Sequence, residues 1–311
     1  MIDVACVGIL VADAIAKPVV KIPQKGKLEL VENLSLFSGG CAASTAIDIA
    51  KIGLKSAIVG KIGNDGFGKF MQNSLNEQGV NTEALMVDNN SSTSASLVIV
   101  SKDSERSFIH CQGANANFVE SDINYDIIKK SGIIFVAGVM LMEKFDGAQC
   151  AKFLKKCKEL KKPTALDVAW DSTGRWMNVL EQSMSYIDYF LPSIEEAVEL
   201  SGKKEPEEIA DYFLSMGPSV VVIKMGQDGC YIKSKNGESR TVPIYKVSPI
   251  DTTGAGDSFC AGFLSALCRG KSLYECGKFA NAVGAHCVMA QGASTGIKSE
   301  AEILQFMEEY K

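Results

Sequence analysis

Residues 251–269, DTTGAGDSFCAGFLSALCR, combine a glycine-rich turn with the start of an apolar helix. Small and apolar side chains cover more than one face of residues 255–269, which predicts a helix packed inside the protein. Gly254 and Gly256 allow the backbone to curl closely around a ligand, and Asp257 falls in the first helical turn. The N–H groups at a helix start attract an anion, and the helix dipole adds partial positive charge. This stretch is therefore a candidate anion site.

Two interpretations of Asp257 fit the spacing equally well. Its carboxylate is placed to take a proton from a nucleophile that attacks a phosphoryl group held by the neighbouring amides. Alternatively, Asp257 only caps the helix and the glycines serve a tight turn, because aspartate is common in a first helical turn.

Short apolar runs alternate along the chain with segments of helical periodicity. This alternation predicts a doubly wound α/β sandwich around a parallel sheet. The expected strands are residues 4–10, 55–60, 133–139, 164–169, 189–192 and 220–225. The expected helices are residues 41–52, 66–78, 146–160, 175–184, 194–201 and 206–215.

Two stretches, at about residues 14–37 and 93–110, depart from this alternation. Both have β-branched, half-polar patterns interrupted by turn residues, which indicates antiparallel strands exposed on one face. We expect a small sheet built from two insertions, either a lid over a site or an edge extension with no catalytic part. No linker or repeat divides the sequence, so residues 1–311 are expected to form a single domain.

Composition excludes several classes of protein. The 311 residues include 32 basic and 37 acidic side chains, a formal charge of −5 with no clustered basic face, so no nucleic-acid partner is expected. Charged residues interrupt the N-terminal apolar stretch, so neither a membrane span nor a signal peptide is expected. Ten cysteines without a C-x-x-C pair indicate reduced core residues of a cytoplasmic protein. His110 and His286 have no second histidine at ligand spacing and are interpreted as structural.

Two further glycine motifs carry weaker signals. SGGCAAST, residues 38–45, precedes a helix of small residues, so its backbone could close on a polar small molecule or simply form a strand-to-helix turn. GNDGFGK, residues 63–69, satisfies the start of a phosphate-binding P-loop but has Phe70 where a Ser or Thr would bind magnesium. Phe259 likewise breaks the G-x-G-x-x-G of a dinucleotide fold, so P-loop and dinucleotide folds are both rejected.

Five segments in sequence order resemble the ribokinase-like, or PfkB-type, carbohydrate kinases over nearly the whole chain. They are Asp13, SGGCAAS (38–44), GKIGNDGFG (60–68), KMGQDG (224–229) and DTTGAGDSF (251–259). The resemblance implies a three-layer α/β/α sandwich with a small β-sheet lid. It also implies transfer of the γ-phosphoryl group of ATP to a sugar-type alcohol.

The resemblance assigns roles to individual residues. It makes Asp257 the base that accepts the hydroxyl proton, and it supplies the anion-hole amides from Gly254, Ala255 and Gly256. The acceptor-binding residues that it implies are Asp13, Gly39 and Gly40, with the hydroxyl of Ser44. An ionised Asp13 suits this task because a carboxylate accepts hydrogen bonds from two adjacent hydroxyls.

On the nucleotide side, the resemblance implies Lys224, Gly226, Gly229 and Thr252, with Asn281 beside the adenine. It also implies a monovalent-cation site, with potassium as the candidate ion, at Asp251, Thr253 and residues 291–294. Carboxylates so close to phosphates need positive charge, which magnesium bound with ATP supplies. Glu196 is the candidate for water-mediated support of that metal.

The chain departs from the family pattern at Ser44 and at Ser193, where members commonly have asparagine. Within residues 167–176, Asp171 and Arg175 are polar candidates for the acceptor side. Trp170 is either a stacking wall or core, and Trp176 is expected in the core.

The sequence therefore predicts an ATP-dependent kinase for a small sugar or sugar acid. The alternatives are a nucleoside kinase of the same fold, a non-catalytic sugar or nucleotide sensor, and, more remotely, a dehydrogenase. The exposed lid sheet is also expected to be able to pair with a second copy in a homodimer.

Overall fold

The computed structural model describes residues 1–102 and 105–310 and contains a nine-stranded sheet in the order β13-β12-β11-β10-β9-β8-β1-β4-β5. Seven of its strands run parallel to one another: β1 (Ile2–Gly8), β4 (Ser56–Gly63), β5 (Asn81–Asp88), β8 (Ser131–Val139), β9 (Thr164–Val168), β10 (Tyr189–Phe190) and β11 (Val220–Lys224). Strands β12 (Cys230–Ser234) and β13 (Ser239–Val242) are antiparallel and end the sheet.

The six apolar runs expected as strands are β1, β4, β8, β9, β10 and β11. Their side chains are buried on both faces, as strands covered by helices on two sides require. The sequence analysis missed β5. That strand lies at the sheet edge, with only Ala84 and Leu85 buried, so its half-polar pattern is not that of a central strand.

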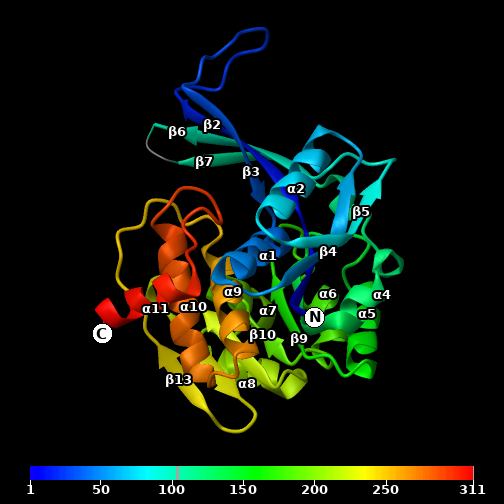
Figure 1. The fold of residues 1–311 in the computed structure, drawn as a ribbon, viewed down its shortest axis with the longest axis vertical. Coiled ribbons are helices and arrows are strands. Elements are labelled where there is room, and N and C mark those ends of the chain that lie inside the picture. The colour runs from blue at the N-terminus through cyan, green and yellow to red at the C-terminus, as the bar shows by residue number, and fades with distance from the viewer. Residues whose placement is uncertain (103–104, 311) are drawn as a thin grey trace.

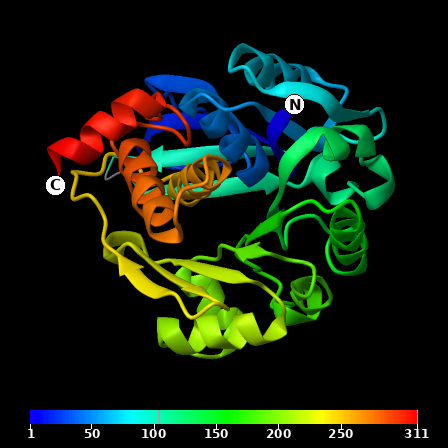
Figure 2. The ribbon, with the colours of Figure 1, turned by 60° about the horizontal axis from the view of Figure 1, so that its bottom comes forward.

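Helices cover both faces of the sheet, and each face has its own apolar core (Figures 1 and 2). One core includes residues of α1 (Cys41–Ile52), α2 (Gly66–Glu77), α9 (Ala255–Cys268), α10 (Leu273–Val288) and α11 (Glu300–Glu309). The other includes residues of α4 (Tyr125–Lys130), α5 (Ala148–Glu159), α6 (Met177–Met184), α7 (Ile194–Ser201) and α8 (Pro206–Met216). Short helical turns are α3 (Gly113–Ala116), η1 (Glu120–Asp122) and η2 (Gly226–Asp228). The predicted three-layer α/β/α sandwich is confirmed.

A separate four-stranded sheet, the lid, has the order β3-β2-β6-β7 and projects from the body (Figure 1). It consists of β2 (Val11–Val19), β3 (Asn33–Gly39), β6 (Ala95–Ser101) and β7 (Arg106–Cys111). The expectation of purely antiparallel pairing was wrong, because β2 and β6 are parallel. Each is the outgoing strand of a hairpin that leaves the body, and the two outgoing strands lie side by side. Residues 103 and 104 of the predicted lid segment lie outside the described residues.

No helix within the described residues combines the length and apolar character needed to cross a membrane. The rejected P-loop at residues 63–69 is a turn followed by α2, as predicted. Asp65 caps this helix and accepts a hydrogen bond from the Gly68 N–H at 2.8 Å.

Candidate active site

Charged side chains meet at the carboxyl ends of the parallel strands. Asp167 is next to last in β9 and Lys224 is the last residue of β11. The chain order changes direction across β1, with β4 on one side and β8 on the other. In open α/β sheets, the crevice outside the carboxyl ends at such a point is the usual ligand site.

Asp167 and Lys224 form a nearly buried ion pair. The Lys224 Nζ lies 2.6 Å from Asp167 Oδ2, and the two side chains are 12% and 4% exposed. The Val168 N–H donates to the other carboxylate oxygen at 3.0 Å, and the thiol of Cys260 on α9 donates to Oδ2 at 3.5 Å. Burial raises the pKa of Asp167 to about 7 although Lys224 opposes this rise. Burial would lower the pKa of Lys224, but Asp167 above all, with Cys260 and Glu196, raises it, so the ammonium group stays charged.

The α9 helix begins beside this pair. Gly254 precedes it with φ 78°, and a Cβ there would lie 2.6 Å from Ala293, so only glycine fits the turn. A Cβ built on Gly256 would lie 3.6 Å from Lys224 Nζ, so the ammonium group directly adjoins the predicted anion hole. The Ala255 N–H already donates to Thr252 O at 3.2 Å and would have to exchange this bond to bind a phosphate oxygen.

Asp257 is half-buried in the first turn of α9. Burial raises its pKa to about 6, while Lys224 and a hydrogen bond with the Cys41 side chain oppose the rise. A carboxylate with this pKa is mostly ionised at neutral pH and is more basic than an ordinary aspartate, which suits a general base.

The start of α1 packs against the start of α9. The Thr45 hydroxyl donates to the Asp257 carbonyl at 3.3 Å, and Cys41 hydrogen-bonds to the Asp257 side chain. Gly40 has φ 91°, and a Cβ there would lie 2.7 Å from Ile9 O. Ser44 is buried, and its Oγ has no hydrogen-bond partner among the described residues. The predicted acceptor motif and the predicted base therefore adjoin one another.

Asp13 lies on β2 of the lid, opposite the end of β3. Burial raises its pKa to about 6, and a hydrogen bond from Ser96 opposes this rise. A Cβ on Gly39 would lie 2.1 Å from Asp13 Oδ2, so the glycine leaves space for the carboxylate.

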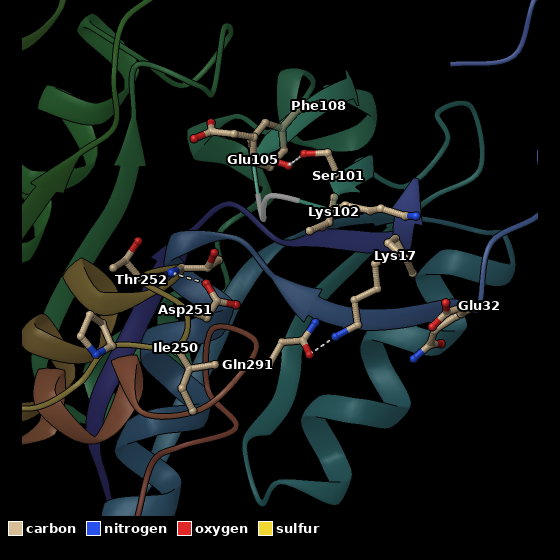
Figure 3. A pocket seen from close by; sticks show the side chains of 15 residues that line it. Lys17, Glu32, Ser101, Lys102, Glu105, Phe108, Ile250, Asp251, Thr252 and Gln291 are labelled. Atoms are coloured by element: carbon tan, nitrogen blue, oxygen red, sulfur yellow. Dashed lines mark hydrogen bonds between the residues drawn. The ribbon is translucent and has the colours of Figure 1, made fainter. Parts of the chain in front are cut away.

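A cavity of about 1110 Å³ separates the lid from the loops at Pro249–Thr253 and Gln291 (Figure 3). Asp251 joins these loops, because its two carboxylate oxygens accept hydrogen bonds from the N–H groups of Thr253 and Gly292, each at 2.9 Å. From the lid, the Lys17 ammonium group donates to Gln291 Oε1.

Other predicted site residues have structural contacts that the sequence analysis did not foresee. Glu196 and Ser193 form the capping box of α7, and the charge of Glu196 also acts on Asp167 and Asp257. The Asn281 amide donates to the carbonyls of Val242 and Pro243, each at 3.0 Å. A Cβ on Gly229 would lie 2.0 Å from Val242 O.

The loop after β9 is held by Asp171, whose oxygens accept hydrogen bonds from the backbone N–H groups of Thr173, Arg175 and Trp176. The Arg175 guanidinium donates to Met140 O at 2.7 Å. Trp170 is 53% exposed, which rules out the core interpretation, and Trp176 packs half-buried against the core.

Sequence reasoning missed the partnership of Asp167 with Lys224 and that of Cys41 with Asp257. A charged residue inside the apolar run TALDVA was the available signal for Asp167, since buried charges are usually paired. Cys41 gave no signal beyond its place after the glycine pair.

The model of the pfkB family carbohydrate kinases matches residues 1–300. The chain belongs to this family. It is 30% identical over 303 residues to a probable fructokinase-5 of Arabidopsis thaliana, covering 92% of this chain and 93% of that protein. It is 28% identical to a ribokinase of Haemophilus influenzae, with 94% and 95% covered. The structure of Arabidopsis thaliana ribokinase complexed with ribose and ATP superposes with a TM-score of 0.86 and 25% identity, covering 99% of both chains.

Membership in the family makes this chain a carbohydrate kinase, a phosphotransferase with a small-molecule sugar as acceptor. The resemblance found in the sequence, the ribokinase-like fold and the enzyme class are thereby confirmed. The roles of individual residues stay predictions.

Proposed function

We propose that this kinase transfers the γ-phosphoryl group of ATP to a hydroxyl of a small sugar-type acceptor, with Asp257 as general base. The observation that supports this most directly is the position of Asp257. Its half-buried carboxylate lies in the first turn of α9, next to Lys224 and to the start of α1, the helix that follows the glycine pair. The predicted acceptor motif, the proposed base and the positive charge of Lys224 therefore lie next to one another.

In the proposed reaction, Asp257 takes the proton of the attacking acceptor hydroxyl. The acceptor oxygen bonds to the γ-phosphorus while the bond from that phosphorus to the bridging oxygen breaks, and ADP leaves with the electron pair. The N–H groups of Gly254 and Gly256, and Ala255 once its bond to Thr252 is exchanged, stabilise the equatorial oxygens together with the dipole of α9. The Lys224 ammonium group, which Asp167 holds, adds a full positive charge.

Acceptor hydroxyls would be held by Asp13 and by the backbone around Gly39 and Gly40. The buried Ser44 Oγ, which has no hydrogen-bond partner in the described part of the chain, would supply a further polar contact next to the base. Asp171 would act on the acceptor side by shaping its loop, because its oxygens are engaged within that loop.

The nucleotide would lie along Lys224, Gly226, Gly229 and Thr252, with Asn281 near the adenine ring.

Asp167, Glu196 and Asp257 act electrostatically on one another and on Lys224, so the site has an excess of negative charge that suits a divalent cation. Among the described residues no three acidic, His or Cys side chains are arranged to hold a metal ion. Mg²⁺ is usually held by substrate phosphates, waters and one or two carboxylates, so the site fits it, with Glu196 as the protein group. Bound with ATP, Mg²⁺ neutralises phosphate charge.

We also propose a potassium site at the loops that Asp251 joins, with Thr253 and residues 291–294 offering backbone oxygens. Turnover faster in potassium than in sodium is the expected result, and equal rates would contradict the site.

The outer face of the lid supports a proposed homodimer. Leu34, Leu36, Leu97 and Ile109 are exposed there as an apolar surface on a sheet whose edges are open. Sedimentation of the wild type and of a Leu34→Lys, Ile109→Lys variant tests this, and a concentration-independent monomer would contradict it.

An ADP-release screen over pentoses, hexoses, sugar acids, inositols and nucleosides identifies the acceptor.

The general base is tested with the variant Asp257→Asn, and Asp126→Asn, at an exposed position, is the control. We expect kcat to fall about 10²- to 10⁴-fold with little change in ATP affinity and no loss of melting temperature. A folded variant with more than about a tenth of the wild-type kcat would contradict the role of Asp257 as base. ATP binding without turnover of any acceptor would instead favour the sensor alternative.

A further inference from the structure

Two side-chain hydrogen bonds join α1 to the first turn of α9, and the two helices pack against one another (Figure 1). The Thr45 hydroxyl of α1 donates to the main-chain carbonyl of Asp257 at 3.3 Å. At the next residue of α9, the Ser258 hydroxyl donates to Asp48 Oδ2 at 2.6 Å. Thr45 and Asp48 are three positions apart in α1, so they lie on the same face of that helix. Together they hold the backbone of the first turn of α9 against α1.

The hydrogen bond between Ser258 and Asp48 is short and fully enclosed. Both residues are 0% exposed. A distance of 2.6 Å is typical of a hydroxyl that donates to an ionised oxygen, a bond roughly twice as strong as one between neutral groups. When the carboxyl group is protonated, its own O–H can donate to Ser258 Oγ, and the Ser258 hydrogen can turn to Ala293 O at 3.4 Å. The two side chains therefore stay bonded in either state.

Asp48 is an unfavourable residue for this position if only stability counts. Moving a carboxylate out of water is costly unless a positive charge is close. The Lys51 ammonium group, one turn further along α1, donates to Ser294 O at 2.8 Å and acts on Asp48 only as a minor electrostatic influence. The charge of Asp257 opposes ionisation of Asp48. An apolar residue would serve the core better, and residues that cost stability are often retained because activity needs them.

These contacts fix the groups proposed to act on the phosphoryl group. The carbonyl of Asp257, the proposed base, is bound by Thr45, and the residue after it is bound by Asp48. Helix α1 begins directly after Gly40 of the predicted acceptor motif. The distance between acceptor and base thus depends on how the first turn of α9 lies against α1. Small displacements matter, because a misplacement of about 1 Å can cost about 100-fold in rate.

We infer that Asp48 and Ser258 are positioning residues for phosphoryl transfer, which hold the Asp257 carboxylate and the N–H groups of the first turn of α9 in place relative to the start of α1. This inference rests on the proposed function, because it takes Asp257 as the base. Both side chains are enclosed between the helices, so neither contacts the acceptor or ATP. Their loss should therefore lower kcat and leave the affinity for both substrates in place.

The first test is Ser258→Ala, assayed with ATP and the best acceptor of the ADP-release screen, in which fructose and ribose are included. We expect kcat to fall at least about fivefold, and about 100-fold if the turn moves by about 1 Å. Both KM values should stay within about threefold of the wild type, because a misplaced base weakens the transition state and not substrate binding.

Two substitutions of Asp48 separate positioning from folding. Asp48→Leu has the same branched shape but no acceptor atom, so it should lower kcat as Ser258→Ala does, without a parallel loss of melting temperature. Asp48→Asn keeps an oxygen for the Ser258 hydrogen, in a weaker neutral bond, and should retain at least about a third of the wild-type kcat. In the variant with both Ser258→Ala and Asp48→Leu, the losses of kcat should not add, because both changes remove one and the same bond.

Ser265→Ala is the matched control. Ser265 is also buried on α9, seven residues further along, and its Oγ has no hydrogen-bond partner within the part of the chain that the structure describes. This variant should keep the wild-type kcat and KM values, and a loss equal to that of Ser258→Ala would contradict a specific role for Ser258.

The outcome for Asp257→Asn distinguishes this inference from the proposed function. Suppose that Asp257→Asn loses turnover, but kcat falls less than about fivefold in Ser258→Ala or in Asp48→Leu, or the losses add in the double variant. The positioning role would then be overturned and Asp257 would remain the base. If Asp257→Asn keeps its kcat, the proposed function fails, and this inference fails with it.

Discussion

Replacing Lys224 with methionine isolates the energetics of the buried ion pair. Methionine has a similar length and fills the space of the lysine stem, so the main change is loss of the ammonium group. Among the residues that the structure describes, Asp167, 4% exposed, would then keep only the Val168 N–H and the weak Cys260 thiol as partners. Removing one member of a buried pair typically costs about 3–5 kcal/mol, because the other charge stays buried without compensation.

The pH dependence of this loss follows from the Asp167 carboxyl. Its pKa in the folded wild type is already about 7, above that of an exposed aspartate, so ionisation opposes folding as the pH rises toward 7. Without Lys224 this pKa rises further. The destabilisation caused by Lys224→Met should therefore be larger at pH 8 than at pH 5, where a protonated Asp167 tolerates burial.

Urea unfolding at both pH values measures the loss, and a double-mutant cycle with Asp167→Asn separates the pair from its surroundings. The double variant has no buried charge at this point and should be more stable than Lys224→Met alone. Lys233→Met, on the adjacent strand β12, removes an ion pair with the exposed Glu207 and Asp211 and is the matched control that should change stability little. Equal stability of the wild type and Lys224→Met at pH 8, or strict additivity in the cycle, would refute the reasoning.

Three more predictions concern protonation and space in the site. The kcat/KM should fall below about pH 6, because Asp257 must be ionised to take a proton and its pKa is about 6; a profile flat down to pH 5 would contradict this. Asp48 is buried on α1, accepts a hydrogen bond from Ser258 at 2.6 Å, and has a pKa that burial raises to about 7. The folded protein therefore holds a proton that the unfolded chain releases between about pH 4 and 7, so wild-type stability should decline over that window. Asp48→Asn should remove the contribution of Asp48 to this decline and stabilise the protein at pH 8 by up to about 4 kcal/mol, with no gain near pH 4 in urea unfolding. Gly39→Ala would place a Cβ 2.1 Å from Asp13 Oδ2, so Asp13 must move, and we expect a raised acceptor KM with an unchanged ATP KM.

Local pattern was enough to predict most of the fold. The helices Cys41–Ile52 and Ile194–Ser201 begin and end where the sequence analysis placed them. Central strands such as VVVIK are continuous apolar runs, because a parallel sheet covered on both sides buries every side chain. The edge strand β5 and the parallel pairing of β2 with β6 escaped prediction. The half-polar pattern of β5 follows from its place at the edge of the sheet. The parallel pairing follows from how the two hairpins, far apart in sequence, come together in the fold.

The site was predictable only where glycines and a carboxylate fall together in the sequence. The segment DTTGAGD marks the candidate site in the sequence, because two glycines, Asp257 and the start of a helix are contiguous there. The partners of Lys224 and of Asp257 lie 57 and 216 positions away in sequence, at Asp167 and Cys41, and nothing local marks them. His110 was interpreted as structural because the sequence has no second histidine at the spacing that a metal site would need. Its hydrogen bond to Ser96 depends on strand register across the lid, which composition does not reveal.

The interleaved order of the lid constrains how such an enzyme could be re-engineered. Although its strands come from two separate insertions, β2 and β6 form the central pair, so each hairpin contributes one inner and one outer strand. A chimera that takes only residues 11–39 or only residues 95–111 from a relative would pair β2 of one protein with β6 of the other. The side chains of these two strands have not evolved to pack together. Both segments would have to be grafted together, and the starts of α1 and α9 could then stay untouched. Under the proposed roles of these residues, acceptor binding and phosphoryl transfer depend on separate segments, so an exchange made at all four segment ends would change the first and leave the second in place.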